Sequence, residues 1–242
     1  SNQGKDDPSY RRMELMMNDM ELGKMISATY KQAKKTIRSE KFKPIADQFD
    51  TEKADVRFLT ADNWSALPDT LDSANVKPPL ECEAYILTFE VLYLKNLYMN
   101  QSLKKSQREI SWNHTLSVGV VDIVLDGHKE PLSVLAYMPT IYILMCFNNK
   151  DQWSPKELAE ELQFPLEKIG PYIAFLSNAN VLKIVKSEGD NDVDMTIELN
   201  HGYNPKDGYK LNILIDPVIE KAHDENHNGP NNDEVMKILK EI

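Results

Sequence analysis

Cysteine, glycine and long apolar runs are scarce in this chain of 242 residues. Its two cysteines, Cys82 and Cys146, are too few and too far apart to build a zinc cluster, and their apolar surroundings indicate buried thiols in a reducing compartment. The nine glycines form no G-x-x-x-x-G-K or G-x-G-x-x-G phosphate loop. No apolar run reaches the ~18 residues that a membrane helix needs. These shortages disfavour a nucleotide-binding enzyme, a cysteine-ligated zinc protein and a membrane-spanning protein.

Positive charge is also in short supply. The chain has 28 Lys and Arg against 38 Asp and Glu, which gives a formal net charge of −10. A general nucleic-acid binder gathers phosphates with a basic surface, so this balance disfavours that class, although a local basic patch stays open. We therefore expect no nucleic-acid partner.

The histidines provide two incomplete motifs. His223 and His227 in HDENH have the i, i+4 spacing of a zinc-protease helix. However, Asp224 stands where that motif needs glutamate, and the surrounding composition is that of a solvated tail. His114 has serines and an aspartate nearby in sequence but no G-x-S-x-G elbow, which favours a structural histidine. We therefore expect no catalytic residue, no metal and no cofactor.

The apolar periodicity predicts two helices in the first part of the chain. Residues 8–40 predict one long helix with two partly overlapping apolar faces. One face consists of Leu22, Ile26, Tyr30, Ala33 and Ile37, and the other of Met13, Met16, Met17 and Met20. A helix that is apolar over so much of its girth packs on more than one neighbour, so it indicates a larger helical bundle or an oligomer. Residues 79–99 predict a second helix, and DVRFLTADNW between the two predicts a short strand that ends at Trp64.

The segment REISWNHTLSVGVVDIVLDG, residues 108–127, is the most distinctive one. Apolar and polar residues alternate from Ile110, and a β-branched run follows, so the pattern predicts a half-buried strand. The turn LDGHKE and the strand PLSVLAY come next, and YKLNILID further on predicts one more strand that could return to the same sheet.

From Met138 the order helix, helix, helix, hairpin is typical of a winged helix. The first helix is PTIYILMCFNN, and the second starts at Ser154, with Glu157 as the acid of a capping box. The third, FPLEKIGPYIAFLSNANVL, is expected to break or kink at Gly170–Pro171. The strands VLKIVKS and DMTIELN form the predicted hairpin.

This winged helix has little that would recognise DNA. The candidate recognition helix, Pro165–Asn178, presents Lys168 as its only basic residue, and the wing SEGDNDVD is acidic. A groove-reading helix usually presents several Arg, Lys, Asn or Gln. Its apolar residues predict core: Ile169, Tyr172, Ile173, Phe175 and Leu176. A winged-helix DNA-binding transcription regulator is therefore the disfavoured alternative function, and an unrelated enzyme is a third.

In their order and spacing, residues 10 to about 217 resemble the C-terminal region of a cullin, the scaffold of cullin–RING ubiquitin ligases. RRMELMMNDMELGKMISATYK is similar to a cullin bundle helix, with Gly23 where serine is usual. VRFLTADNWSALP and SQREISW resemble the family's "v.iLt.g.WP" and "sGRkL.W". PLECEAYILTFEVLYLKN, PLSVLAYMPTIYILMCFNNKDQWSPKELAEEL and GYKLNILID resemble later cullin segments. The matching residues include Leu59, Thr60, Trp64, Phe89, Tyr93, Arg108, Trp112 and Asn148.

The branch of the family stays open. SWNHTL followed by VDIVL is also similar to the cullin-like subunits of anaphase-promoting complexes. The ending NHGYNPKDGYKLNILID looks more like a true cullin.

The resemblance implies an α+β fold with the end of a helical bundle, then an α/β domain with a small sheet and an inserted winged-helix domain. Residues 1–50 would be the last helix of a four-helix bundle and its connector, and residues 51–137 the first part of the α/β domain. Residues 138–200 would be the winged helix, 201–217 the closing strand of the sheet, and 218–242 a tail with the start of a truncated helix.

The resemblance further implies a non-catalytic scaffold of the cytoplasm and nucleus. A small RING-box-type protein would insert its N-terminal strand into the sheet by β-augmentation and would carry a ubiquitin-charged E2. An adaptor and substrate receptor would bind through a part N-terminal to this sequence, and no membrane partner is expected. MKILK resembles the family's modifier-accepting IVRIMK and would place that lysine at Lys240. The candidate RING-binding residues are Trp112, His114, Leu116, Val118, Val120 and Ile123.

Overall fold

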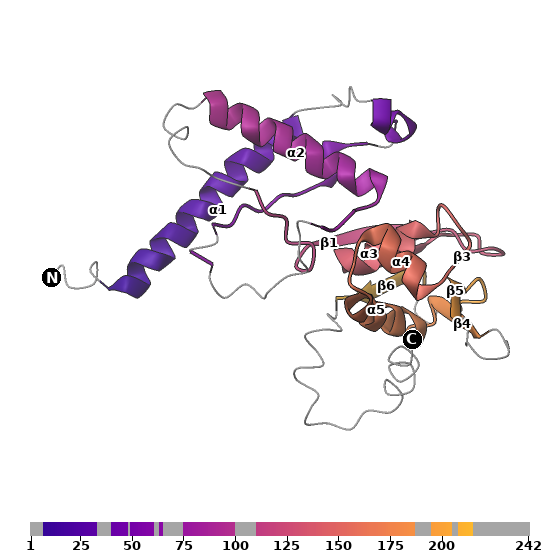
Figure 1. The fold of residues 1–242 in the computed structure, drawn as a ribbon. Helices are drawn as coiled ribbons and strands as arrows, with labels where there is room; N and C mark the ends of the chain where they lie inside the picture. Colours follow the sequence, from indigo (N-terminus) through magenta and orange to yellow (C-terminus); the bar gives the residue numbers. More distant parts are fainter. Residues whose placement is uncertain are drawn as a thin grey trace. The chain divides into compact units, whose positions relative to one another are not determined.

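The computed structural model describes residues 7–32, 40–47, 49–60, 63–64, 75–99, 110–186, 195–204 and 208–214. Contacts divide the chain into two compact units (Figure 1). Unit 1 comprises residues 1–69 and 80–110, and unit 2 comprises residues 70–79 and 111–242. The domain boundaries expected from the sequence stay predictions.

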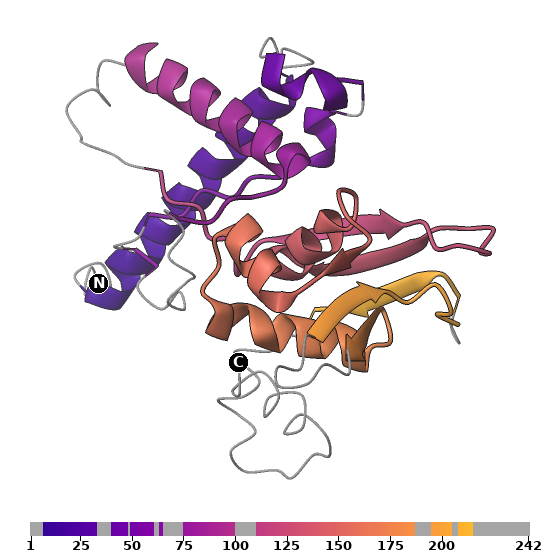
Figure 2. The same ribbon diagram turned by 45° about the vertical axis from the view of Figure 1, so that its right-hand side comes forward.

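Unit 1 contains two helices that cross in both views (Figures 1 and 2). Helix α1 spans Pro8–Gln32 and α2 spans Leu80–Met99, with the 3-10 helices η1 (Glu40–Ile45) and η2 (Thr51–Lys53) between them. A small core consists of Phe42, Ile45, Phe49 and Ala84. The helix predicted over residues 8–40 is thus observed up to Gln32, and residues 33–39 lie outside the described part.

Apart from Tyr30, helix α1 buries small or polar residues, and it exposes most of its large apolar ones. Its buried residues are Asp19, Gly23, Ser27 and Tyr30. Its exposed large apolar residues are Tyr10, Met13, Leu15, Met17, Met20 and Met25. Leu22 and Ile26, expected in the packed stripe with Tyr30, are only half-buried. The methionine face is not covered by the described residues.

The strand predicted to end at Trp64 is wrong for the described residues, where no strand ladder forms. This segment instead lies against α1, because Asp19 accepts four hydrogen bonds from it. The donors are Thr60 N and Asn63 Nδ2 at 3.0 Å, Thr60 Oγ1 at 2.7 Å and Trp64 Nε1 at 3.0 Å. A Cβ on Gly23 would lie 3.2 Å from Phe58 N, so a glycine is what permits this close approach.

Unit 2 begins with a three-stranded sheet, which we call sheet A. Strands β1 (Val118–Ile123) and β2 (Leu132–Tyr137) form an antiparallel hairpin, and β6 (Lys210–Ile213) pairs parallel to β2 on its other side (Figure 2). The strand predicted over residues 209–216 does join the sheet of the strand predicted over residues 131–137, and its last two residues lie outside the described part. The alternation of buried and half-buried residues along β2 matches a strand with one face on the core.

The strand predicted from Ile110 onward is wrong before Val118. Residues 114–116 form a turn in which Asn113 Oδ1 accepts a hydrogen bond from Leu116 N at 2.9 Å. Ser117 Oγ donates to the Asn113 carbonyl at 2.6 Å. The asparagine and serine side chains thus bond to nearby backbone and offer the chain an alternative to a ladder.

The winged helix follows in unit 2, as predicted. Its elements are α3 (Met138–Cys146), β3 (Gln152–Trp153), α4 (Pro155–Leu162), α5 (Leu166–Asn178), β4 (Leu182–Lys186) and β5 (Met195–Leu199). The strand order is β3-β5-β4. The predicted capping box of Ser154 and Glu157 is present, but α5 continues through Pro171 without a break, because the apolar contacts of this buried helix offset one missing backbone hydrogen bond. The wing, residues 187–194, lies outside the described part.

Both cysteines are free thiols, and burial raises the pKa of each to about 12. Cys146 is buried as predicted, whereas Cys82 is half-buried. Within the described ranges, no helix has the length and apolar character to cross a membrane.

Candidate docking site

Strand β1 lies at the edge of sheet A. Among the described residues it pairs with β2 alone, and β6 occupies the far side of β2. An edge strand presents a row of backbone N–H and C=O groups that another chain can pair with.

The register identifies the residues that face this open edge. Met138 N donates to Ser117 O at 2.8 Å, and the register continues from this pair along the hairpin. Hydrogen-bonded pairs alternate with non-bonded ones in an antiparallel ladder, so every second residue after Ser117 bonds to β2. These are Gly119, Val121 and Ile123. The N–H and C=O groups that point away from β2 belong to Val118, Val120 and Asp122.

The side chains of β1 follow the same alternation. Val118 and Val120 are 53% and 65% exposed, whereas Ile123 is 7% exposed. A Cβ on Gly119 would lie 3.0 Å from Met138 Sδ, so the Gly119 side of sheet A packs against α3. We call the opposite side the outer face.

Cross-strand pairs divide the outer face into apolar and polar rows. Val118 lies opposite Tyr137, and Val120 lies opposite Leu135. The next row is polar, because Asp122 lies opposite Ser133, whose Oγ donates to Asp122 Oδ1. Across β2, Ser133 lies opposite Lys210 in this same row.

The structure brings together two of the six predicted docking residues at the edge, Val118 and Val120. Ile123 belongs to the same strand but is buried on the α3 side. The other three precede the strand: Trp112 and Leu116 are half-buried, and His114 is buried. Asp122 was missed as a docking candidate, although one charge within a β-branched run is a typical feature of an edge strand. Lys240 lies outside the described residues.

His114 is a structural histidine, as predicted from the sequence. Its Nδ1 shares a hydrogen bond of 2.9 Å with the Tyr142 hydroxyl, and the two rings meet edge to face at 5.7 Å. Burial lowers the pKa of His114 to about 4, so the imidazole is neutral at physiological pH. It therefore holds the segment before β1 against α3.

We expect unit 2 to lose about 3 kcal/mol of stability as the pH falls from 6.5 to 4, because unfolded His114 takes up a proton that the folded protein does not. The stability contributed by neutral, buried His114 is fully present above the pKa of the unfolded histidine, and it is lost as the pH falls toward the pKa of the folded one. Urea denaturation at a series of pH values measures the effect. In His114→Gln the slope over this interval should be reduced, and an unchanged slope would show that other groups cause it.

The far end of the β1–β2 hairpin is fastened to the segment that leads to β6. Asp126 N donates to His201 Nδ1 at 3.0 Å, and His128 Nε2 lies 3.2 Å from the His201 carbonyl. The ring of His128 meets that of Tyr209 edge to face at 5.8 Å. These contacts hold the turn of the hairpin, as His114 holds the segment before β1, and they leave the long edge of β1 open.

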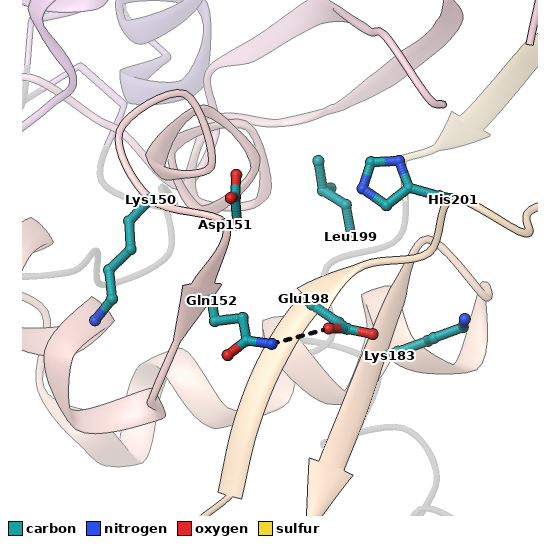
Figure 3. A pocket seen from close by; sticks show the side chains of 7 residues that line it. All are labelled: Lys150, Asp151, Gln152, Lys183, Glu198, Leu199 and His201. Atoms are coloured by element: carbon teal, nitrogen blue, oxygen red, sulfur yellow. Dashed lines mark hydrogen bonds between the residues drawn. The ribbon is translucent and has the colours of Figure 1, made fainter. Parts of the chain in front are cut away.

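A hollow of about 420 Å³ on the winged helix is a second candidate for a binding site. Figure 3 shows Gln152 Nε2 donating a hydrogen bond to Glu198, at 3.2 Å. Lys150 is paired with Glu157 at 2.5 Å. Its lining residues are Lys150, Asp151, Gln152, Lys183, Glu198, Leu199 and His201. Charges of both signs line the hollow, and within the described ranges no group of three or more His, Cys, Asp or Glu could hold a metal ion.

The candidate recognition helix contributes its apolar side chains to the core. Four of the five residues expected there are buried: Ile169, Tyr172, Ile173 and Leu176. Phe175 is half-buried. The side chains of α5 therefore stabilise the winged helix.

Two comparisons identify the family. The family model of the cullin alpha+beta domain matches residues 58–203. The chain is also 24% identical over 190 residues to anaphase-promoting complex subunit 2 of Arabidopsis thaliana. That match covers 78% of this chain and 20% of the relative, so the chain spans only a small part of the relative's length. Since the matched domain includes sheet A's hairpin and the winged helix, this chain belongs to the cullin family.

Proposed function

We propose that this chain is a scaffold segment of a ubiquitin ligase and that it docks a small RING protein by adding a strand of that protein to β1. The observation that carries the proposal is the open edge of β1, where Val118, Val120 and Asp122 direct their backbone groups away from β2. The docked RING protein would hold a ubiquitin-charged E2. The similar Arabidopsis protein is named as a subunit of the anaphase-promoting complex, a relation that supports a place in a multisubunit assembly.

The composition of β1 supports a partner at this edge. Natural edge strands avoid unwanted pairing with charged side chains, proline, bulges or a covering element. In VGVVDI the only such device is Asp122, near one end of the strand, whereas the exposed Val118 and Val120 would lie beside an added strand. Such an edge is a liability when bare, and a bound strand removes the liability.

The exposed face of α1 supports a larger assembly around unit 1. Its methionines are 52–69% exposed at Met13, Met17, Met20 and Met25, which is unusual for a stable surface. We propose that α1 is the last helix of a four-helix bundle and that the domain boundaries follow the cullin order given above. An adaptor with its substrate receptor would bind to the remainder of the scaffold, and the complex would act in the cytoplasm and nucleus.

The direct test is co-expression of this chain with a panel of small RING proteins, followed by purification through a tag on the chain. We expect one of them to co-purify in a stoichiometric complex. Hydrogen exchange should then slow at the amides of Val118, Val120 and Asp122. A complex that protects amides elsewhere and leaves these three unchanged would contradict docking at β1, and failure of every RING protein to bind would contradict the proposed function.

The substitution Val118→Asp should weaken the complex by on the order of a hundredfold, because it places an unpaired charge against the apolar side of the added strand. Isothermal titration with the captured RING protein measures the loss. The matched control is Val91→Asp on α2, where the native valine is 65% exposed in unit 1. Equal losses in both variants would mean that a general effect of charge, rather than position, weakens binding.

A further inference from the structure

Asp122 is the only charged residue of β1, and it lies on the open edge. Its backbone groups point away from β2 and its side chain lies on the exposed outer face. Ser133 Oγ donates to one of its carboxylate oxygens. Within the described part of the chain, no lysine or arginine forms an ion pair with it.

A strand added beside β1 would place one of its side chains directly next to Asp122. Neighbouring side chains on one face of paired strands have Cβ atoms about 4.5–5.5 Å apart, and opposite charges there stabilise the pair whereas like charges destabilise it. The added strand also removes water from the carboxylate, and one serine hydroxyl does not replace that hydration. A cation on the incoming strand provides the missing partner.

The two valines set the remaining positions of the incoming strand. Val118 and Val120 lie on the same face as Asp122, four and two residues before it. Side chains of the incoming strand that share this face recur at every second residue. Two of them must therefore be apolar, and the third, which lies next to Asp122, must be basic.

We infer that Asp122 selects the docking segment: the edge of β1 takes an extended strand that carries Lys or Arg next to Asp122 and apolar residues next to Val118 and Val120. This inference rests on the proposed strand addition and adds the chemistry of the partner. A parallel strand would read apolar-x-apolar-x-basic, and an antiparallel one would read basic-x-apolar-x-apolar.

The test uses synthetic peptides with the cores Val-Thr-Val-Thr-Lys and Lys-Thr-Val-Thr-Val, and versions with Glu in place of Lys. Each is titrated into the ¹⁵N-labelled chain and followed by NMR. One lysine peptide should shift the amides of Val118, Val120 and Asp122, and it should bind roughly tenfold more tightly than its glutamate version. The order that binds gives the direction of the added strand.

The charge-swap variant Asp122→Lys should reverse this preference, so that the glutamate peptide binds more tightly. The control Glu130→Lys makes the same change in charge at an exposed position outside the strand, and it should leave the preference for lysine unchanged. Equal binding of the lysine and glutamate peptides, a reversal in both variants, or no shift of the three amides would each overturn the inference.

The same variants separate this inference from the proposed function. If a RING protein still protects the edge of β1 while Asp122→Lys leaves the peptide preference unchanged, strand addition stands and selection by Asp122 is wrong. If the RING protein leaves the amides of β1 unprotected, the proposed docking is itself wrong.

Discussion

Proline at Val120 should weaken RING binding by about tenfold to a hundredfold while sheet A stays folded. The Val120 N–H points away from β2, so its loss removes a hydrogen bond to the added strand and none from the β1–β2 ladder. It also leaves a carbonyl of the incoming strand without a donor, which costs about 1–3 kcal/mol. Binding of the purified variant to the captured RING protein measures the effect.

The matched control is proline one residue further on. The Val121 N–H bonds to β2 opposite Val134, so Val121→Pro breaks the ladder, and the Val134 carbonyl left without its donor should cost about 1–3 kcal/mol of stability. Circular dichroism and urea denaturation distinguish the two variants. If Val120→Pro unfolds the hairpin as Val121→Pro does, the assignment of inward and outward residues is wrong. If folded Val120→Pro binds at full strength, the RING protein docks elsewhere.

Asp19→Ala should destabilise unit 1 by about 3 kcal/mol or more. Asp19 is 93% buried, and its carboxylate accepts hydrogen bonds from Thr60, Asn63 and Trp64. Burial alone raises the pKa of Asp19, but the hydrogen bonds from Asn63, Thr60 and Trp64 lower it below its ordinary value. Alanine leaves these donors without an acceptor, and each buried group left in this state costs about 1–3 kcal/mol.

Hydrogen exchange at the amide of Thr60 reports this loss locally, because the protein has two units that need not unfold together. Asp55→Ala is the matched control. Asp55 also contacts α1, through Ser27 Oγ at 2.9 Å and Lys31 Nζ at 3.2 Å, but its side chain is exposed and its loss should cost no more than about 1 kcal/mol. A small effect at Asp19 equal to that at Asp55 would contradict its role as an anchor.

Local patterns predicted much of unit 2. The capping box at Ser154 and Glu157 depends on residues three positions apart, and the alternation along β2 depends on one buried face. Both features need no knowledge of distant contacts. The predicted winged-helix order therefore agrees with the structure from Met138 to Leu199.

The errors occurred where side chains bond to backbone or to distant residues. Thr60 looks like part of a strand, but its backbone N–H bonds to Asp19, 41 positions earlier. Asn113 looks like the polar member of an alternating strand, yet its side chain closes a turn. A hydropathy pattern predicts neither of these two conformations, because each depends on a hydrogen bond between one polar atom and its partner.

For the docking site, the sequence could predict the strand but not which of its two faces is exposed. The β-branched run indicated Val118 and Val120, while the assignment of Ile123 to the same surface required knowing which face packs on α3. Asp122 was considered only as a neighbour of His114. Its place at the edge became visible only once the register with β2 was known.

The reversed character of α1 has a consequence for how variation in this chain should be interpreted. In most amphipathic helices the apolar positions tolerate the fewest substitutions. In α1 three of the four buried positions are Asp19, Gly23 and Ser27, where size and hydrogen bonding decide what fits, and the fourth is Tyr30, whereas Met17 and Met25 are open to water. A polar replacement of a methionine would thus be silent in assays of folding and visible only in assays of assembly. Replacing Gly23 with a larger residue would instead be detected in assays of folding. Variants of this one helix therefore fall into two groups, those that damage the fold and those that damage a complex.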